Sequence, residues 1–164
     1  MKEENDRLRR FEAAYAQYGT AVYRLAMVYL GRAADAEDVT QEAFLRLLSK
    51  APAFADETHE KRWLMRVTVN LCRDQLRGFW RRRAVELSES CPVPEGPDRE
   101  VLSVILALPE PYKGPIHLHY YEGYSVSEVA EILHLGQSAV KMRLKRGREM
   151  LRLELDMEGE EEST

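Results

Sequence analysis

Residues 125–151, SVSEVAEILHLGQSAVKMRLKRGREML, have the pattern of two helices joined by a short turn. Ser125 can cap the first helix, and Glu128 follows three residues later, as in a capping box. Residues 134–136 interrupt the apolar spacing, and the pattern predicts a second helix over residues 137–153. Two helices with such a turn are typical of a helix-turn-helix, whose second helix enters the major groove of DNA.

The second of these helices is basic on its outer face. Its apolar stripe consists of Val140, Leu144, Gly147 and Leu151. Counting about 100° per residue from Val140 places a polar set on the opposite side and its flanks: Ser138, Lys141, Met142, Arg143, Lys145 and Arg146. We predict that this set contacts the base edges and phosphates of duplex DNA. A solvated basic face on an ordinary helical hairpin is the alternative.

Charge is segregated along the chain. The 164 residues carry a formal net charge of −4, which argues against a uniformly basic nucleic-acid binder. Residues 61–83 and 141–152 are nevertheless strongly positive, and residues 154–162 are negative. The length allows one medium domain or two small ones, and the pattern indicates two.

No catalytic or metal-binding motif stands out in the sequence. Cys72 and Cys91 lack the spacing of a zinc site or a disulfide framework, and His117 and His119 do not share a helix face. We therefore expect neither an enzyme nor a bound metal, cofactor or small-molecule substrate. The sequence also lacks a signal peptide and an apolar run long enough to cross a membrane, which predicts a cytoplasmic protein without membrane insertion.

Two amphipathic stretches are expected in the N-terminal third. Residues 7–30 carry apolar side chains at three-and-four spacing, softly interrupted near Gly19, which predicts one or two helices. Residues 35–50, DAEDVTQEAFLRLLSK, predict a further helix with Asp35 as its N-cap. The expected buried residues of this helix are Val39, Phe44, Leu47 and Leu48, with Asp38, Gln41, Glu42 and Arg46 facing away from most of that stripe.

A loop and a long basic helix follow. Residues 51–60, APAFADETHE, read as a loop that carries a single aromatic residue, Phe54. Residues 60–83 predict a helix with five inward side chains: Trp63, Leu64, Val67, Leu71 and Cys72. Its cations alternate with aromatic residues, a mixture that suits single-stranded or opened nucleic acid. The alternative is that Trp63 and Trp80 belong to the core and the arginines only solubilise the helix.

A change of composition separates the two parts of the chain. Residues 85–99, VELSESCPVPEGPDR, hold three prolines and show no helical or strand period. Beyond them, Pro109 is expected to end one helix and Pro115 to stand in the first turn of the next. Because strand alternation is missing, we predict an all-α fold of two small helical domains joined by a flexible linker. The expected segments are residues 1–84, a linker over 85–98, a second domain over 99–153 and an acidic tail over 154–164.

Three motifs, in order, resemble those of the extracytoplasmic-function class of the sigma-70 family of bacterial transcription initiation factors. DAEDVTQEAF at residues 35–44 resembles the region two helix that docks on the β′ clamp of RNA polymerase. RWLMRVTVNLCRDQLR at residues 62–77 resembles the segment that binds the non-template strand of the minus-ten element. YYEGYSVSEVAEIL followed by SAVKMRLKRGREML, at residues 120–133 and 138–151, resembles region four, whose second helix reads the minus-thirty-five element.

The resemblance implies roles for particular residues. The polymerase-binding set is Asp38, Gln41, Glu42 and Phe44. The minus-ten set, which includes further cations of the long helix, is Phe54, Arg62, Trp63, Arg66, Asn70, Arg73, Asp74 and Arg77. Phe54 falls in the loop that holds a flipped base in the family. The implied partners are core RNA polymerase, through its β′ clamp and β flap, promoter DNA and an anti-sigma factor. A sigma factor of this kind directs promoter recognition, strand opening and transcription initiation.

Several residues depart from the family pattern. His134 replaces the glycine that is usual in the turn, Gly136 replaces a common Ser or Thr cap, and Gly147 stands where alanine is typical. Gly114 and Pro115 interrupt a helix that is smoother in relatives. Two other interpretations remain open at this point. One is a dimeric helix-turn-helix regulator of duplex DNA, and the other is a helical adaptor for acidic proteins that has no salt-dependent affinity for DNA.

Overall fold

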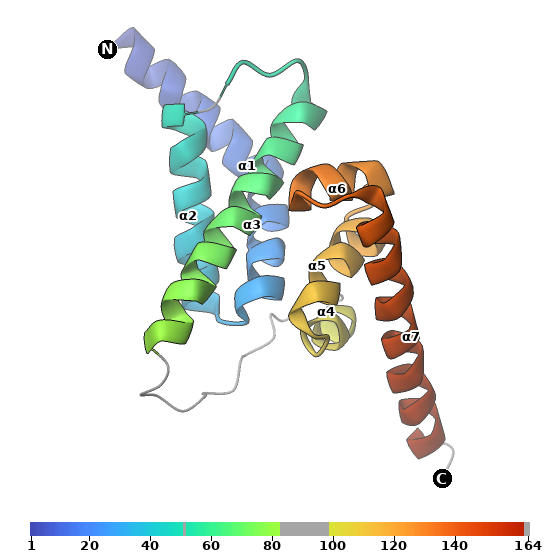
Figure 1. Ribbon diagram of the computed structural model, residues 1–164. Helices are drawn as coiled ribbons and strands as arrows, with labels where there is room; N and C mark the ends of the chain where they lie inside the picture. The colour runs from blue at the N-terminus through green and yellow to red at the C-terminus, as the bar shows by residue number, and fades with distance from the viewer. Residues whose placement is uncertain (51, 83–98, 163–164) are drawn as a thin grey trace. The chain divides into compact units, whose positions relative to one another are not determined.

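A computed structural model of the protein describes residues 1–50, 52–82 and 99–162, and these residues form helices and connecting turns (Figure 1). Side chains are described for residues 1–50, 52–78 and 103–152. No strand occurs in these segments, so the prediction of an all-α fold is confirmed. The chain divides into two compact units, Met1–Pro92 and Val93–Thr164. The linker expected over residues 85–98 lies outside the described residues, as do the side chains of Trp80, Cys91 and the acidic tail.

The first unit consists of three helices that pack side by side: α1 (Lys2–Leu30), α2 (Ala33–Lys50) and α3 (Glu57–Arg82) (Figure 1). Helix α1 runs without a break through Gly19, which resolves the choice between one and two helices. It ends at Gly31, whose φ of 71° lies in the left-handed region that glycine adopts without strain. Helix α2 begins at Ala33, so Asp35 stands in its first turn and is not the N-cap that the sequence predicted.

The inward face of α3 is rotated from the predicted one. Leu64 and Cys72 are fully buried, as expected. Trp63, Val67 and Leu71 remain partly exposed. The core positions are taken by Met65, Thr68, Val69 and Cys72, at helical spacing. This face is selected because α3 packs against both α1 and α2. The Thr68 hydroxyl donates to the Leu64 carbonyl at 2.7 Å, so a polar residue is tolerated in the core.

The second unit contains α4 (Arg99–Leu106), α5 (Glu110–Ile116), the π-helix η1 (His117–Tyr121), α6 (Val126–Leu133) and α7 (Gln137–Glu162). Pro109 is the N-cap of α5, and Pro115 lies inside that helix near its end. The sequence-based placement of Pro115 in a first turn is therefore wrong. The first turn of a helix tolerates proline because the N–H groups there have no partner within the helix. In α5 the proline of the first turn is Pro111.

The α6–turn–α7 segment has the predicted helix-turn-helix form. The Ser125 hydroxyl oxygen accepts from the Glu128 N–H at 3.1 Å, and the Ser125 N–H donates to the Glu128 carboxylate at 3.1 Å. This is the capping box that the sequence indicated. His134 ends α6 with φ 55° and ψ 48°, in the left-handed region that favours glycine. Val129, Ile132, Leu133, Val140 and Leu144 join the two helices in one core.

Candidate nucleic-acid and polymerase interfaces

The outer face of α7 carries the set predicted to bind duplex DNA. Ser138, Lys141, Met142, Lys145 and Arg146 are exposed, and Arg143 is partly exposed. Met142 is 55% exposed, whereas Val140 and Leu144, on the other side of the helix, are 0% and 3% exposed. The six side chains therefore share a surface that the core of the unit leaves open, with cations around an unbranched apolar side chain.

Tyr120 and Arg148 extend this surface, and the sequence reasoning missed both. The Arg148 guanidinium donates to the Tyr120 hydroxyl oxygen at 2.6 Å, and Tyr120 is 50% exposed. Helical spacing could have indicated Arg148, because it lies seven residues after Lys141 and three after Lys145, on the same face of the helix. No sequence pattern indicated Tyr120, because it comes from η1 and meets α7 only in the folded unit.

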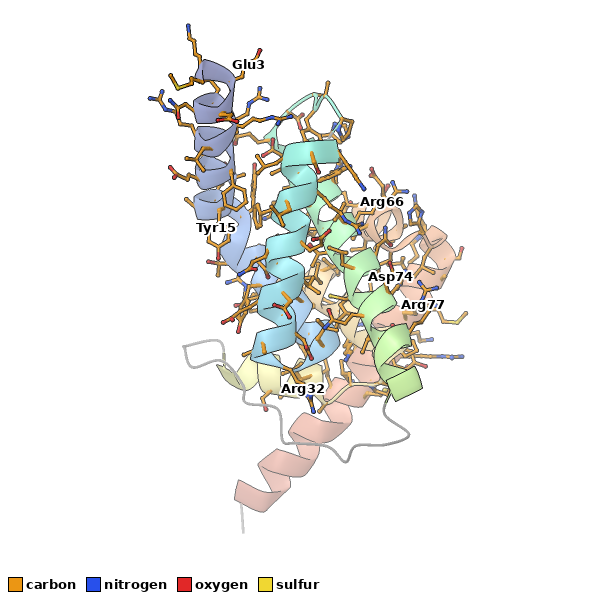
Figure 2. All side chains as sticks on the ribbon, turned by 90° about the vertical axis from the view of Figure 1, so that its left-hand side faces the viewer. Glu3, Tyr15, Arg32, Arg66, Asp74 and Arg77 are labelled. Carbon is orange, nitrogen blue, oxygen red and sulfur yellow. The ribbon has the colours of Figure 1, made fainter. Side chains whose placement is uncertain are left out.

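The predicted minus-ten residues of α3 lie opposite its buried face. Helical spacing places Trp63, Arg66, Asn70, Arg73 and Arg77 within one arc about 80° wide, away from Met65 and Cys72. Arg66, Asp74 and Arg77 follow one another along α3 (Figure 2). They are exposed, and Arg62, Trp63, Asn70 and Arg73 are partly exposed. The face of α3 that is predicted to bind single-stranded DNA is therefore accessible, and it carries cations, one amide and one indole.

Asp74 is an anion within this basic face, and the structure pairs it with Arg77. The Arg77 Nη2 to Asp74 Oδ1 distance is 2.7 Å, and the two side chains are 75% and 64% exposed. At such exposure the pair contributes little to stability, since solvent screens it. Its geometric effect is to orient the guanidinium, because a carboxylate three residues earlier fixes one N–H direction.

Phe54 belongs to a small aromatic group where the loop meets α3. Its ring centroid lies 5.7 Å from that of Trp63 and 5.3 Å from that of His59, both edge to face. The His59 ring is held by the Ala55 N–H, 3.3 Å from Nδ1. Phe54 is partly exposed, which fits a ring that is positioned by neighbours but still accessible.

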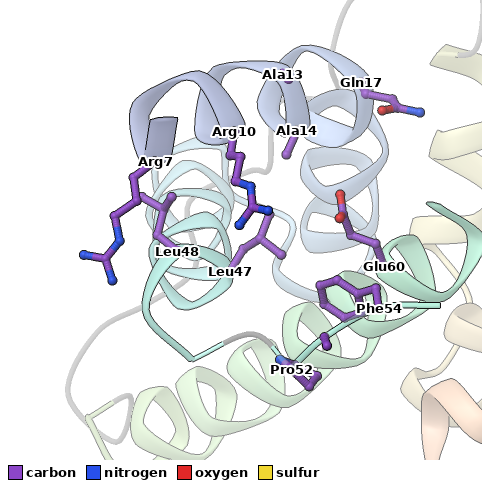
Figure 3. A pocket seen from close by; sticks show the side chains of 11 residues that line it. Arg7, Arg10, Ala13, Ala14, Gln17, Leu47, Leu48, Pro52, Phe54 and Glu60 are labelled. Atoms are coloured by element: carbon purple, nitrogen blue, oxygen red, sulfur yellow. The ribbon is translucent and has the colours of Figure 1, made fainter. Parts of the chain in front are cut away.

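Phe54 also lines a cavity of about 540 Å³ inside the first unit (Figure 3). The wall is formed by α1, the end of α2, the loop and the start of α3, and its polar residues are Arg7, Arg10, Gln17 and Glu60. A planar group of the size of a nucleobase fits such a volume, and the two arginines supply positive charge at its wall. The sequence reasoning did not connect Arg7 and Arg10 with the loop, because more than forty residues separate them in the chain.

The predicted polymerase-binding residues of α2 divide into two groups. Asp38, Gln41 and Glu42 are exposed, whereas Phe44 is fully buried at 0% exposure. Phe44 therefore belongs to the core of the unit and not to its surface, against the expectation of a direct contact with polymerase. Its ring packs against Tyr15 at 5.1 Å and Phe11 at 6.0 Å. The apolar side chain that α2 presents to solvent is Leu45, which is 53% exposed.

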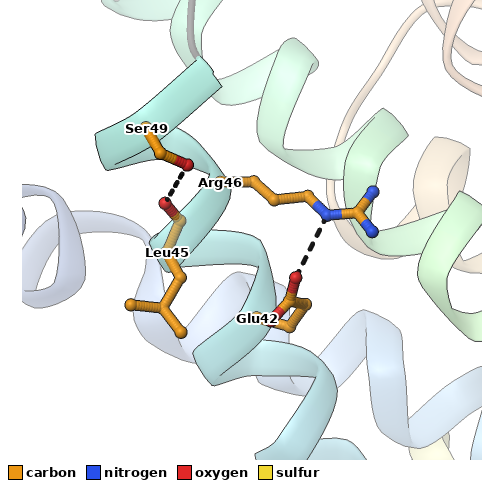
Figure 4. Close-up of polar contacts among 4 residues, drawn as sticks. All are labelled: Glu42, Leu45, Arg46 and Ser49. Carbon is orange, nitrogen blue, oxygen red and sulfur yellow. Dashed lines mark hydrogen bonds and ion pairs between the residues drawn. The ribbon is translucent and has the colours of Figure 1, made fainter.

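Leu45 stands next to a polar pair on the surface of α2. Arg46 Nε lies 3.3 Å from Glu42 Oε1, and the Ser49 hydroxyl donates to the Leu45 carbonyl at 3.0 Å (Figure 4). Asp38, Glu42 and Leu45 recur at helical spacing on one face. Protein interfaces combine an apolar centre with a polar rim, and an exposed leucine beside ordered charges has this composition. The adjacent α1 exposes two further large side chains, Leu8 at 56% and Tyr15 at 48%.

The histidines of the second unit have structural roles. His117 is fully buried, stacks on Tyr121 at 5.1 Å and lies 3.4 Å from the Glu122 carboxylate. His119 Nδ1 lies 2.6 Å from the Tyr124 carbonyl oxygen. Within the described part of the chain, no three His, Cys, Asp or Glu side chains come together as a metal site would require.

Two tyrosines of the first unit, Tyr18 and Tyr23, have a raised pKa. Burial raises the pKa of Tyr18 above its ordinary value, and the carboxylates of Glu60 and Glu57 raise it further. The Tyr18 hydroxyl donates to the Glu57 carbonyl at 3.3 Å, which ties α1 to the start of α3. The pKa of Tyr23 is also raised, mainly by burial and then by Glu37. Both side chains are therefore neutral, and neither has the geometry of a reacting group.

Comparison with known proteins agrees with this geometry. The family model for Sigma-70 region 2 matches residues 14–82, and that for Sigma-70, region 4, matches residues 98–151. The ECF RNA polymerase sigma factor SigW of Bacillus subtilis is 32% identical over 158 residues, which cover 84% of each chain. The ECF RNA polymerase sigma factor SigE of Mycolicibacterium smegmatis is 34% identical over 149 residues, covering 83% of this chain and 58% of that one.

Two solved structures share the fold. The sigma factor RpoE of Bartonella quintana, in complex with the anti-sigma factor NepR, matches with a TM-score of 0.78 at 20% identity, covering 90% of this chain and 98% of that one. CnrH, in complex with the cytosolic domain of CnrY, matches with a TM-score of 0.64 at 24% identity, covering 92% and 90%. No helix in the described segments is long and apolar enough to cross a membrane. The two matched regions, in the predicted order, and the identity to SigW show that this chain belongs to the family of ECF sigma factors of RNA polymerase.

Proposed function

We propose that this protein binds core RNA polymerase in the cytoplasm and directs it to promoters through two separate DNA-binding surfaces. The observation that carries the proposal is the placement of the predicted contact residues of α3 and α7. In each helix they occupy the face opposite the core, and each cation among them is exposed or partly exposed. As a family member, the protein is a transcription initiation factor and not an enzyme.

The division of labour follows the two units. We propose that residues 1–84 bind polymerase and the minus-ten element, and that residues 99–153 bind the minus-thirty-five element. Residues 85–98 then connect the two units, and residues 154–164 are the acidic segment that follows the second. Two compact units in one chain support this assignment.

Upstream recognition is assigned to the outer face of α7. In this proposal Ser138, Met142, Lys145 and Arg146 face the bases in the major groove, and Lys141 and Arg143 reach phosphates on the flanks. The exposure of Met142 supports it, because an apolar side chain at the centre of this face can contact a thymine methyl group.

Downstream recognition is assigned to α3 and the Phe54 loop. The cations Arg62, Arg66, Arg73 and Arg77 would follow the backbone of the non-template strand, with Asp74 orienting Arg77. Asn70 supplies hydrogen bonds to an unpaired base, and Phe54 and Trp63 supply faces or edges for stacking. Extruding a base costs a few kcal/mol, so a cavity that accepts it beside Phe54 favours the melted state only where the sequence fits.

Polymerase binding is assigned to the surface of α2. We propose that Asp38, Gln41 and Glu42 contact the β′ clamp together with Leu45, while Phe44 supports them from the core. The second unit would contact the β flap, as family membership implies. An anti-sigma factor that covers these surfaces would hold the protein inactive until a signal arrives.

Run-off transcription with purified core polymerase on a randomised promoter library tests the proposal. The wild-type chain is expected to select two spaced elements. Lys145→Ala and Arg146→Ala should weaken selection of the upstream element, whereas Asn70→Ala and Phe54→Ala should reduce permanganate reactivity of the melted strand. Failure to bind core polymerase would reject the proposal, and palindromic binding without polymerase would favour a dimeric regulator instead.

A further inference from the structure

A row of cations continues along α7 beyond the residues already assigned to DNA. Lys141, Lys145, Arg148 and Arg152 recur at intervals of four, three and four residues, so they lie on one side of the helix. All four are exposed. The first two belong to the six residues predicted to bind duplex DNA, and the last two lie outside that set.

The length of this row decides what its second half can reach. Eleven residues separate Lys141 from Arg152, which is about 16 Å along a helix axis, whereas the major groove is about 12 Å wide. A recognition helix contacts base edges with its N-terminal part. A straight helix that enters in this way leaves the curved groove further along, so Arg148 comes level with the phosphates at its edge.

Tyr120 holds Arg148 in place at this position. The Arg148 Nη1 to Tyr120 Oη distance is 2.6 Å. The Tyr120 ring contacts the His119 ring edge to face at 4.8 Å, and His119 is itself fixed through Nδ1 to the Tyr124 carbonyl at 2.6 Å. The arginine is therefore oriented by a chain of contacts that starts in the backbone of η1 and its following turn.

The chemistry of this pair suits an anion. A tyrosine hydroxyl is neutral, so Arg148 keeps its full charge while using one of its five N–H donors. The hydroxyl also keeps its own proton, which it can donate while accepting from Arg148. A guanidinium and a phenol side by side can then donate to two oxygens of one phosphate, and a preoriented guanidinium loses less side-chain entropy on binding.

We propose that Tyr120 and Arg148 form a clamp on one DNA phosphate at the edge of the major groove, which sets the register of α7 on the upstream element. This proposal rests on the proposed binding of duplex DNA by the second unit. Both are positioning residues, because a phosphate contact orients the helix and reads no base.

The test uses the full chain bound to core polymerase and a labelled promoter duplex selected by the wild-type protein, titrated at about 50 to 200 mM salt. Arg148→Ala is expected to weaken binding roughly tenfold, as for the loss of one charged hydrogen bond. The slope of log affinity against log salt should fall by about 0.9. The preference for the selected upstream element over a point-mutated one should stay unchanged.

The variant Tyr120→Phe distinguishes the contribution of the clamp from that of the Arg148 charge alone. It keeps the ring and the contact with His119, and it is expected to weaken binding about threefold without changing the salt slope, since it removes only the neutral partner. In the Arg148→Ala background its effect should be smaller than in the wild type, because each side chain of the pair positions the other. Arg152→Ala is the matched control, since it removes the same charge one turn further along and should change affinity less than about twofold.

Three results would overturn the clamp. They are an equal loss of affinity and salt slope in Arg152→Ala and Arg148→Ala, a Tyr120→Phe effect of the same size with and without Arg148, and unaffected variants of a protein whose wild type binds normally. Normal helical content and thermal unfolding of each variant would show that the losses do not come from misfolding. Wild-type protein without salt-dependent promoter binding would reject the function proposed for the second unit, whereas normal wild-type binding with unaffected variants would reject the clamp alone.

Discussion

Gly147 of α7 packs directly against Ile116 of α5. A Cβ atom at position 147 would lie 2.7 Å from Ile116 Cγ1 and 2.8 Å from Ile116 Cδ1, closer than carbon atoms approach without displacement. Glycine in a helix interior destabilises it by up to about 1 kcal/mol relative to alanine. The close approach of the two helices compensates for this loss, so glycine at position 147 has a structural reason in this chain.

Gly147→Ala is therefore expected to destabilise the second unit by about 1 to 2 kcal/mol, because overpacking outweighs the gain in helix propensity. Urea unfolding of the full chain measures the change. Gly78→Ala is the matched control, since a Cβ there meets nothing within 4 Å and α3 should gain up to about 1 kcal/mol. The same sign of effect at both glycines would contradict this explanation.

His134→Gly should stabilise the second unit by about 0.5 to 1 kcal/mol. His134 holds φ 55° at the end of α6, where a side chain is strained and glycine is not. His134→Ala is the control, because alanine keeps the strain and should bring little gain. Thermal unfolding compares the three proteins, and an equal gain from both substitutions would show that the imidazole ring, and not the backbone, was unfavourable.

Phe44 and Leu45 are neighbours in the chain with opposite expected effects. Phe44→Ala should lower the free energy of unfolding by about 3 to 5 kcal/mol, because the ring is fully buried. Leu45→Ala should change stability by less than about 0.5 kcal/mol, since the side chain is 53% exposed. It should weaken binding to core polymerase about tenfold if the leucine is buried in that complex. Unfolding and polymerase titration of both variants test the assignment, and unchanged polymerase binding by Leu45→Ala would remove that residue from the interface.

Tyr18 predicts a fall of stability at alkaline pH. Burial, with help from Glu60 and Glu57, raises the pKa of Tyr18 above its ordinary value of 10.0 in the folded chain. The unfolded chain therefore releases this proton at lower pH than the folded chain. The contribution to the free energy of unfolding is fully present below about pH 10 and declines as the pH rises through the raised pKa.

Tyr18→Phe should make this alkaline decline shallower, because phenylalanine has no proton to lose. Urea unfolding at a series of pH values from neutral to alkaline measures the slope for both proteins. Tyr23, whose pKa is also raised, should leave a residual slope in the variant. An identical slope with and without the Tyr18 hydroxyl would contradict the assignment.

The inward face of α3 was predicted incorrectly because this helix has a wide apolar arc. Trp63, Val67 and Leu71 recur every four residues, and Met65, Val69 and Cys72 recur after four and three. Both spacings are helical, so periodicity alone offers two neighbouring inward faces. The packing of α3 against two helices at once selects the second. The burial of Phe44 was expected from its apolar stripe. Its assignment to the polymerase surface came from the motif, which does not distinguish a contact residue from the residue that supports it.

Residues a few positions apart are enough to predict the all-α fold, the order of the longer helices, the capping box at Ser125 and the basic face of α7. Packing between helices is needed to explain which face of α3 is buried, why position 147 is glycine, and how Tyr120 meets Arg148 across twenty-eight positions of the chain. Helical periodicity is a local property of the chain. Close packing and hydrogen bonding between helices depend instead on distances that are fixed only when the whole unit folds.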